Sequence, residues 1–103
     1  MSDINKDPIV EGLIDTWTDK NKPVSEQIRE RITKAGERFF AADNISNYIE
    51  KGEKEKLIHE LTSKFEAVLD SLIIDRVNDP NSAGTGKRLA KMYINEIMGG
   101  RYN

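Results

Sequence analysis

The stretch that decides the fold class is Thr85-Gly-Lys-Arg-Leu-Ala-Lys-Met-Tyr-Ile-Asn-Glu-Ile-Met-Gly-Gly-Arg-Tyr102. A threonine hydroxyl such as that of Thr85 is a good acceptor for a free N–H in a first helical turn. Glycines such as Gly99 and Gly100 supply the left-handed backbone that ends many helices. Five residues between them recur at helical spacing, and four of the five can face a core: Leu89, Met92, Tyr93, Glu96 and Ile97. The stretch therefore predicts an amphipathic helix over about residues 86–98.

A second long helix is predicted over about residues 53–74, with acidic side chains in its first turn, where the helix dipole favours them. Its apolar residues form one stripe: Leu57, Leu61, Phe65, Val68 and Leu72. Three more widen that stripe to a broad face: Ile58, Leu69 and Ile73. We expect this helix to be the backbone of the core.

Between residues 24 and 41 the pattern predicts another helix, with Gly36 interrupting it without ending it. Its apolar residues recur at helical steps: Val24, Ile28, Ile32, Ala35 and Phe39. After a turn at 42–44, Asn44 is expected to cap a short helical piece that Gly52 closes. That piece holds Ile45, Tyr48 and Ile49.

Residues 1–22 are predicted to form a short helix over about 8–19, followed by a linker. Asp7-Pro8 is a typical helix start, and an apolar stripe follows it: Ile9, Val10, Leu13, Ile14 and Trp17. Trp17 is either a packing residue or an anchor for a partner, since aromatic side chains are enriched at the centres of interfaces. Together, these patterns predict an all-α fold: a small antiparallel assembly of three to four main helices over residues 23–103, preceded by the segment 1–22.

Composition excludes several classes of chemistry. With 103 residues, 37% hydrophobic and 33% charged, the chain is one small domain. It has no cysteine, and therefore no disulfide, thiol nucleophile or thiolate zinc site. A net charge of -2 gives no general support for nucleic-acid binding. Apolar runs are too short for a membrane span, and no secretory signal is visible, so we expect a cytoplasmic protein without membrane or nucleic-acid partners.

No catalytic, cofactor-binding or metal-binding set can be assembled from the sequence. Gly84-Thr-Gly-Lys-Arg88 resembles a phosphate loop, but Asn81 stands where the first glycine belongs and Arg88 where a hydroxyl belongs. A weaker anion contact of Lys87 and Arg88 at the helix start stays open. His59 is the only histidine and lacks the companions that a zinc site needs. The alternating Glu and Lys residues over 50–60 are typical of a solvated helix face.

The run Thr85-Gly-Lys-Arg-Leu-Ala-Lys-Met-Tyr93, with Asn95-Glu-Ile97 and Gly100-Arg-Tyr102, resembles the N-terminal part of GTP cyclohydrolase I. The family carries Thr-Pro-x-Arg-Val-Ala-x-Met-Tyr on a helix, and Gly86 replaces its proline. The likeness covers residues 25–102, is strong only over 65–102, and is nearest to the shorter-loop versions carried by some bacteriophages. Zinc and the catalytic cysteines and histidines belong to a following domain of that family and have no counterpart here.

The resemblance implies a helical scaffold of a protein in pterin or folate biosynthesis, inactive alone, whose family reaction converts GTP to dihydroneopterin triphosphate. Its expected partner is a catalytic domain of that type, or further copies of itself as a homo-oligomer. The alternative is a stand-alone helical protein that regulates a partner protein; zinc-dependent turnover by the chain itself is a third, weaker hypothesis. The candidate interaction residues are Trp17, Thr85, Lys87, Arg88, Leu89, Tyr93 and Ile97.

Overall fold

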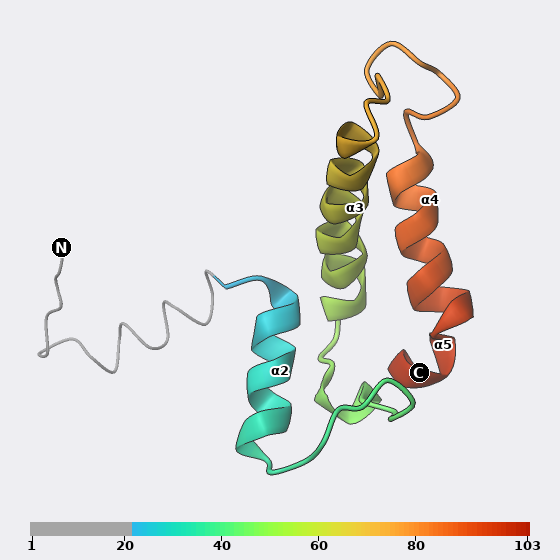
Figure 1. Cartoon of the computed structure of the whole chain (residues 1–103). Coiled ribbons are helices and arrows are strands. Elements are labelled where there is room, and N and C mark those ends of the chain that lie inside the picture. The colour runs from blue at the N-terminus through green and yellow to red at the C-terminus, as the bar shows by residue number, and fades with distance from the viewer. Residues whose placement is uncertain (1–21) are drawn as a thin grey trace, which may run out of the picture.

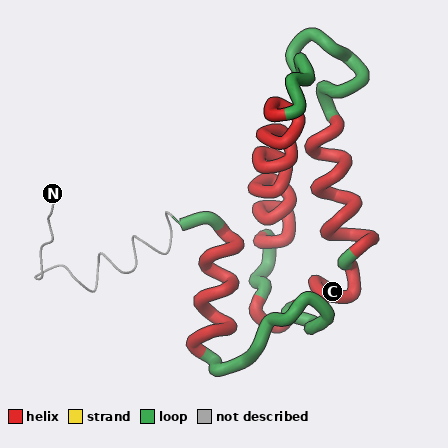
Figure 2. Tube along the Cα trace, in the orientation of Figure 1, coloured by secondary structure: helices red, strands yellow, loops and turns green. Residues whose placement is uncertain are grey.

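The computed structural model describes residues 22–103, and within them every regular element is helical (Figure 2). The α-helices are α2 (Val24–Lys34), α3 (Glu53–Ser71), α4 (Thr85–Met92) and α5 (Gly99–Tyr102). A short 3-10 turn, η2 (Ser46–Tyr48), and a π-helical turn, η3 (Tyr93–Ile97), complete them. The predicted all-α class is confirmed, whereas the helix expected over 8–19, with Trp17, lies outside the described residues.

Helices α3 and α4 form a long antiparallel hairpin, and α2 lies beside only the lower part of α3 (Figure 1). The core sits at this lower end, where α2, η2, the start of α3 and η3 meet. Its buried residues form one cluster: Val24, Ile28, Ile32, Ile45, Leu57 and Ile94. Within the described residues, the upper part of the hairpin therefore consists of α3 and α4 alone. Each of these helices buries only the side that faces the other, and its remaining sides are exposed to solvent.

Helix α2 buries the predicted row Val24, Ile28 and Ile32 but ends at Lys34, seven residues earlier than expected. Gly36 adopts a left-handed φ of 72°. The amides of Gly36 and Glu37 then donate to the carbonyls of Thr33 and Ile32, at 3.0 and 3.1 Å. This pair of bonds is the Schellman motif, which satisfies the last carbonyls of a helix and turns the chain away. The prediction that the helix continues past Gly36 is wrong for this reason.

Helix α3 also ends early, at Ser71, through the same motif. Here the left-handed position is occupied by Ile73, whose φ is 64°. Its amide donates to the Asp70 carbonyl at 3.0 Å, and the amide of Ile74 donates to that of Leu69 at 3.1 Å. Such a φ is strained for a β-branched side chain, because Cβ approaches the neighbouring carbonyl oxygen. Ile73 is also 93% exposed, so burial does not offset the strain.

Helix α4 begins at Thr85, but the Thr85 hydroxyl caps no amide. It donates to the Asn81 carbonyl at 3.3 Å and accepts from the Arg88 guanidinium at 3.0 Å. The helix turns its smallest residues toward α3: Gly86 and Ala90 are buried. A Cβ at Gly86 would lie 2.8 Å from Glu66 Cγ and 3.2 Å from the carbonyl oxygen of Thr62. Larger side chains such as Leu89 and Tyr93, which were expected to face the core, instead lie beside the contact between Gly86 and α3.

The last helix widens into a π-helical turn over Tyr93–Ile97, where the amide of Met98 donates to the carbonyl of Tyr93 at 3.0 Å. A π-helical turn has more residues per turn than an α-helix, so residues three apart no longer lie on the same side. Ile94 is therefore 1% exposed, whereas Ile97 points outward with 57% exposure. The helix ends at Ile97, close to the predicted residue 98. The predicted left-handed glycine geometry is wrong, because Gly99 and Gly100 belong to α5 and neither has a positive φ.

Candidate interaction surfaces

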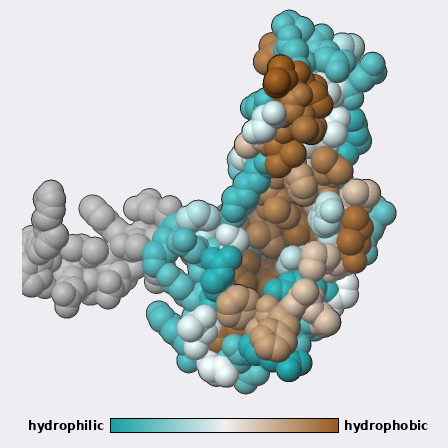
Figure 3. Space-filling model, viewed as in Figure 1, coloured by the Kyte–Doolittle hydropathy of each residue, from teal (hydrophilic) through white to brown (hydrophobic). Residues whose placement is uncertain are grey.

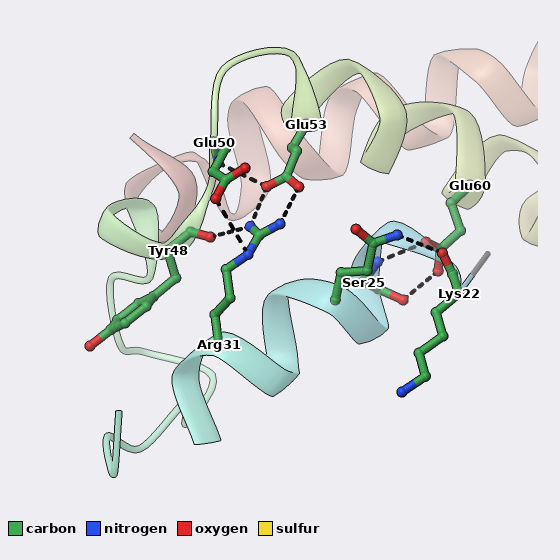
Figure 4. A network of polar contacts seen from close by, with 8 residues as sticks. Lys22, Ser25, Arg31, Tyr48, Glu50, Glu53 and Glu60 are labelled. Atoms are coloured by element: carbon green, nitrogen blue, oxygen red, sulfur yellow. Dashed lines mark hydrogen bonds and ion pairs between the residues drawn. The ribbon is translucent and has the colours of Figure 1, made fainter. Parts of the chain in front are cut away.

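A buried ion pair fixes α2 against the start of α3 (Figure 4). The guanidinium of Arg31 donates twice to the carboxylate of Glu53, with both N–O distances at 2.5 Å. It also donates to the Tyr48 carbonyl at 2.8 Å. The hydrogen bonds from Arg31 lower the pKa of Glu53, outweighing its burial. Glu53 therefore stays ionised and holds α2 and η2 together.

A second polar contact joins the first turn of α2 to the middle of α3 (Figure 4). The backbone amide of Ser25 donates to Glu60 Oε1 at 3.0 Å, and its hydroxyl donates to Oε2 at 2.6 Å. Burial by itself raises the pKa of Glu60, but the bonds from Ser25 and Lys64 outweigh it and lower that pKa. Because α2 starts beside Glu60, none of its turns covers the part of α3 that lies above.

Arg101 fastens the C-terminal turn to the loop that follows α2. Its guanidinium donates to the carbonyls of Phe39, Phe40 and Asp43, at 3.3, 2.5 and 3.0 Å. The carbonyl of Arg101 accepts from the amide of Ile45 at 2.8 Å. Arg101 therefore stabilises the fold, because its guanidinium is hydrogen-bonded to backbone carbonyls of the loop.

One side of the hairpin exposes large apolar side chains, which we call the apolar side. Its exposed members are Val68, Leu72, Ile73, Val77, Tyr93 and Ile97, and the half-buried Phe65 adjoins them. Phe65, Val68 and Leu72 follow one another at helical spacing along α3, so they share a side of that helix. The ring of Tyr93, on the neighbouring helix, stacks on Phe65 with centroids 5.5 Å apart. Figure 3 shows hydrophobic surface near the tip of the hairpin and in the hollow between the hairpin and α2.

Along α3 and into the loop beyond it the exposed fraction rises toward the tip, from 54% for Val68 to 63% for Leu72 and 88% for Val77. At the lower end of the hairpin, Tyr93 is 38% exposed and Ile97 is 57% exposed. Isolated exposed apolar residues are normal on protein surfaces, but a contiguous row of them marks an interaction site. The row along α3 is contiguous, and none of the other helices within residues 22–103 covers it.

The structure separates the candidate residues predicted from the sequence. Tyr93 and Ile97 belong to the apolar side, and Leu89 is half-buried beside them. Thr85 and Arg88 bond to each other and to the Asn81 carbonyl. Lys87 lies elsewhere, in a groove between α3 and α4. Trp17 lies outside the described residues.

Sequence reasoning missed the exposure of Val68, Leu72 and Ile73, which it assigned to the core face. The available signal was the width of the apolar face of α3, which is broader than one antiparallel neighbour can cover. No group of three histidine, cysteine or carboxylate side chains within residues 22–103 is placed to hold a metal ion. His59 is exposed.

No family model, curated protein or solved structure matches the chain. Among the described residues, none of the helices combines the length and the apolar character that crossing a membrane requires.

Proposed function

We propose that this chain is a helical scaffold that binds a protein partner through the apolar side of its α3–α4 hairpin. The observation that supports it most is the row Phe65, Val68 and Leu72, which runs along α3 with Tyr93 stacked beside it. Apolar surface of this kind gains free energy when a partner removes it from water, at about 25 cal/mol per Å². The proposed role is therefore assembly, with chemistry supplied by the partner.

The partner that we propose is a catalytic domain of GTP cyclohydrolase I type, and the scaffold would serve its reaction on GTP. Support for this identity comes from the resemblance of Thr85–Tyr93 and its glycine-bearing exit to the helical N-terminal region of that family. In such a pair the zinc and its ligands belong to the partner, and this chain contributes packing surface alone.

The alternative is a stand-alone helical protein that regulates a partner of another kind. It is favoured by the closed lower core, where Ile94 of the last helix is 1% exposed and α5 is bonded to the loop after α2. Because the chain buries the core at the lower end of the hairpin with its own residues, that part of the fold does not require a catalytic domain.

The two functions separate in a binding experiment with the full chain. Purified chain is mixed with a zinc-loaded catalytic domain of GTP cyclohydrolase I type that lacks its own N-terminal helices, and the complex is measured by calorimetry. Leu72→Asp should weaken the complex about 10- to 100-fold, the loss expected for removing one buried leucine side chain. Ala42→Asp adds the same charge at an exposed loop position and should leave affinity unchanged. If no complex forms with the wild-type chain, the scaffold proposal is refuted and the regulator becomes the leading hypothesis.

A further inference from the structure

The hairpin also carries a positively charged groove between its two helices. Residues of α3 line it together with residues of α4 and η3: Lys54, Glu55, Ile58, His59, Thr62, Lys87, Lys91 and Asn95. On α4, Lys87 and Lys91 are one turn apart and lie on the side away from Leu89 and Tyr93. The groove encloses about 590 Å³, a volume within the usual range for small-molecule sites.

The lining is positive although the chain is acidic. Three lysines and one carboxylate leave an excess of two positive charges before His59 is counted, whereas the whole chain has a net charge of -2. A local excess of this sign attracts anions to a surface that would otherwise repel them. The groove is thus chemically distinct from the apolar side of the same hairpin.

The fold does not neutralise these lysines. No carboxylate within residues 22–103 forms an ion pair with Lys54, Lys87 or Lys91. The ammonium of Lys54 donates instead to the neutral side chain of Asn103 at 2.5 Å. Six other cations in this part of the chain also form no ion pair with a carboxylate, and none of them lines the groove: Arg29, Lys34, Lys51, Lys56, Arg88 and Arg101.

The positions of the lysines are unfavourable for the helices themselves. Lys54 and Lys87 lie in the first turns of α3 and α4, where the helix dipole disfavours positive charge. Lys87 and Lys91 repel each other as a like-charged i,i+4 pair. A bound anion offsets both effects, because its negative charge lies beside the lysines and screens the repulsion between Lys87 and Lys91.

We propose that this groove binds a small anion with at least two phosphate groups, held by Lys87 and Lys91 at one end and by Lys54 at the other. Eight residues, or about 12 Å of helix, separate Lys87 from Asn95 within the lining of the groove, so the groove is longer than one phosphate group. Lysine ammonium groups suit phosphate as compact point charges. An acidic peptide is less well matched, because the helices use their own backbone groups and provide no edge for its main chain.

The test is calorimetric titration of the full chain with inorganic pyrophosphate. We expect saturable binding at one site, weakened at least about tenfold in Lys87→Gln/Lys91→Gln, as one lost charge-assisted hydrogen bond predicts. Lys54→Gln is a second variant and should also weaken it. The matched control is Lys51→Gln/Lys56→Gln, which removes the same charge from exposed positions outside the groove and should change affinity less than about threefold.

Four results would each overturn the proposal. The first is the absence of saturable binding, and the second is an equal loss in the control, which would mean that binding follows net charge alone. The third is binding of orthophosphate as tight as that of pyrophosphate, and the fourth is tighter binding of hexaglutamate. Circular dichroism of each variant checks that the fold is kept, which we expect because Lys87 and Lys91 are exposed. The test does not depend on any partner of the apolar side, so the two proposals can fail separately.

Discussion

Replacing Ile73 by glycine should stabilise the protein while weakening its proposed interaction. Ile73 has a φ of 64° at the left-handed position of the Schellman motif that ends α3. This conformation costs an L-residue roughly 1–2 kcal/mol. Glycine removes that cost but adds about 0.5–1 kcal/mol of chain entropy in the unfolded state. Since Ile73 is 93% exposed, the substitution sacrifices almost no buried surface.

At the midpoints of these ranges the net gain is about 0.75 kcal/mol, which corresponds to a rise of about 3–6 °C in Tm for a domain of this size. Thermal and urea unfolding followed by circular dichroism would measure it. Ile73→Ala is the matched control, because it removes the same apolar group but keeps a Cβ, and it should recover less than half of the gain. If Ile73→Gly leaves stability unchanged or lowers it, the strain argument is wrong. The same variant should bind the proposed partner more weakly, because the apolar side loses its most exposed member.

Three further predictions concern the contacts that hold the bundle. Because Arg31 lowers the pKa of Glu53, the stability that this carboxylate contributes is present above its unfolded pKa of about 4.3 and is lost as pH falls through the folded value. Glu53→Gln should cost about 1–3 kcal/mol at pH 7 and flatten the acid part of a urea-stability profile. Gly86→Ala should cost about 1–3 kcal/mol by overpacking, whereas Gly100→Ala, with nothing within 4 Å, should be neutral or stabilising in the same assay. Arg101→Ala should cost about 1–3 kcal/mol and speed amide hydrogen exchange over residues 39–45, because its guanidinium donates to the carbonyls of Phe39, Phe40, Ala41 and Asp43. Unchanged exchange there would show that these contacts do not order the loop.

The helices and the residues at which they begin could be predicted from the sequence, whereas the residues at which α2 and α3 end could not. The row Val24, Ile28 and Ile32 gave the buried side of α2 correctly, because residues four apart must share a side. Gly36 was visible, but only the folded backbone shows that it takes the left-handed conformation. Ile73 carried no signal at all, since a β-branched residue is among the last expected at such a position.

The inward side of the last helix was mispredicted for a related reason. Large apolar residues were expected to face the core, but α4 approaches α3 so closely that only Gly86 and Ala90 fit between them. Leu89 and Tyr93 therefore flank the contact. In the same way, the stripe through Val68 and Leu72 indicated an apolar side of α3 without indicating how many neighbours cover it. Exposure depends on the number of neighbours, which is a property of the tertiary arrangement.

The bonds between Arg101 and the loop after α2 also bear on the order in which the protein folds. They join residues up to 62 positions apart, whereas the α3–α4 hairpin forms between neighbours in the sequence. Contacts between distant residues form slowly, and a chain emerges from the ribosome with its N-terminal part first. The core around the apolar row of α2 therefore stays incomplete until Ile94 and Arg101 have been synthesised, although Ile45 and Leu57 are available earlier. During that interval the nascent chain exposes the most apolar surface. It is then most prone to aggregation and offers a chaperone the largest apolar surface to bind.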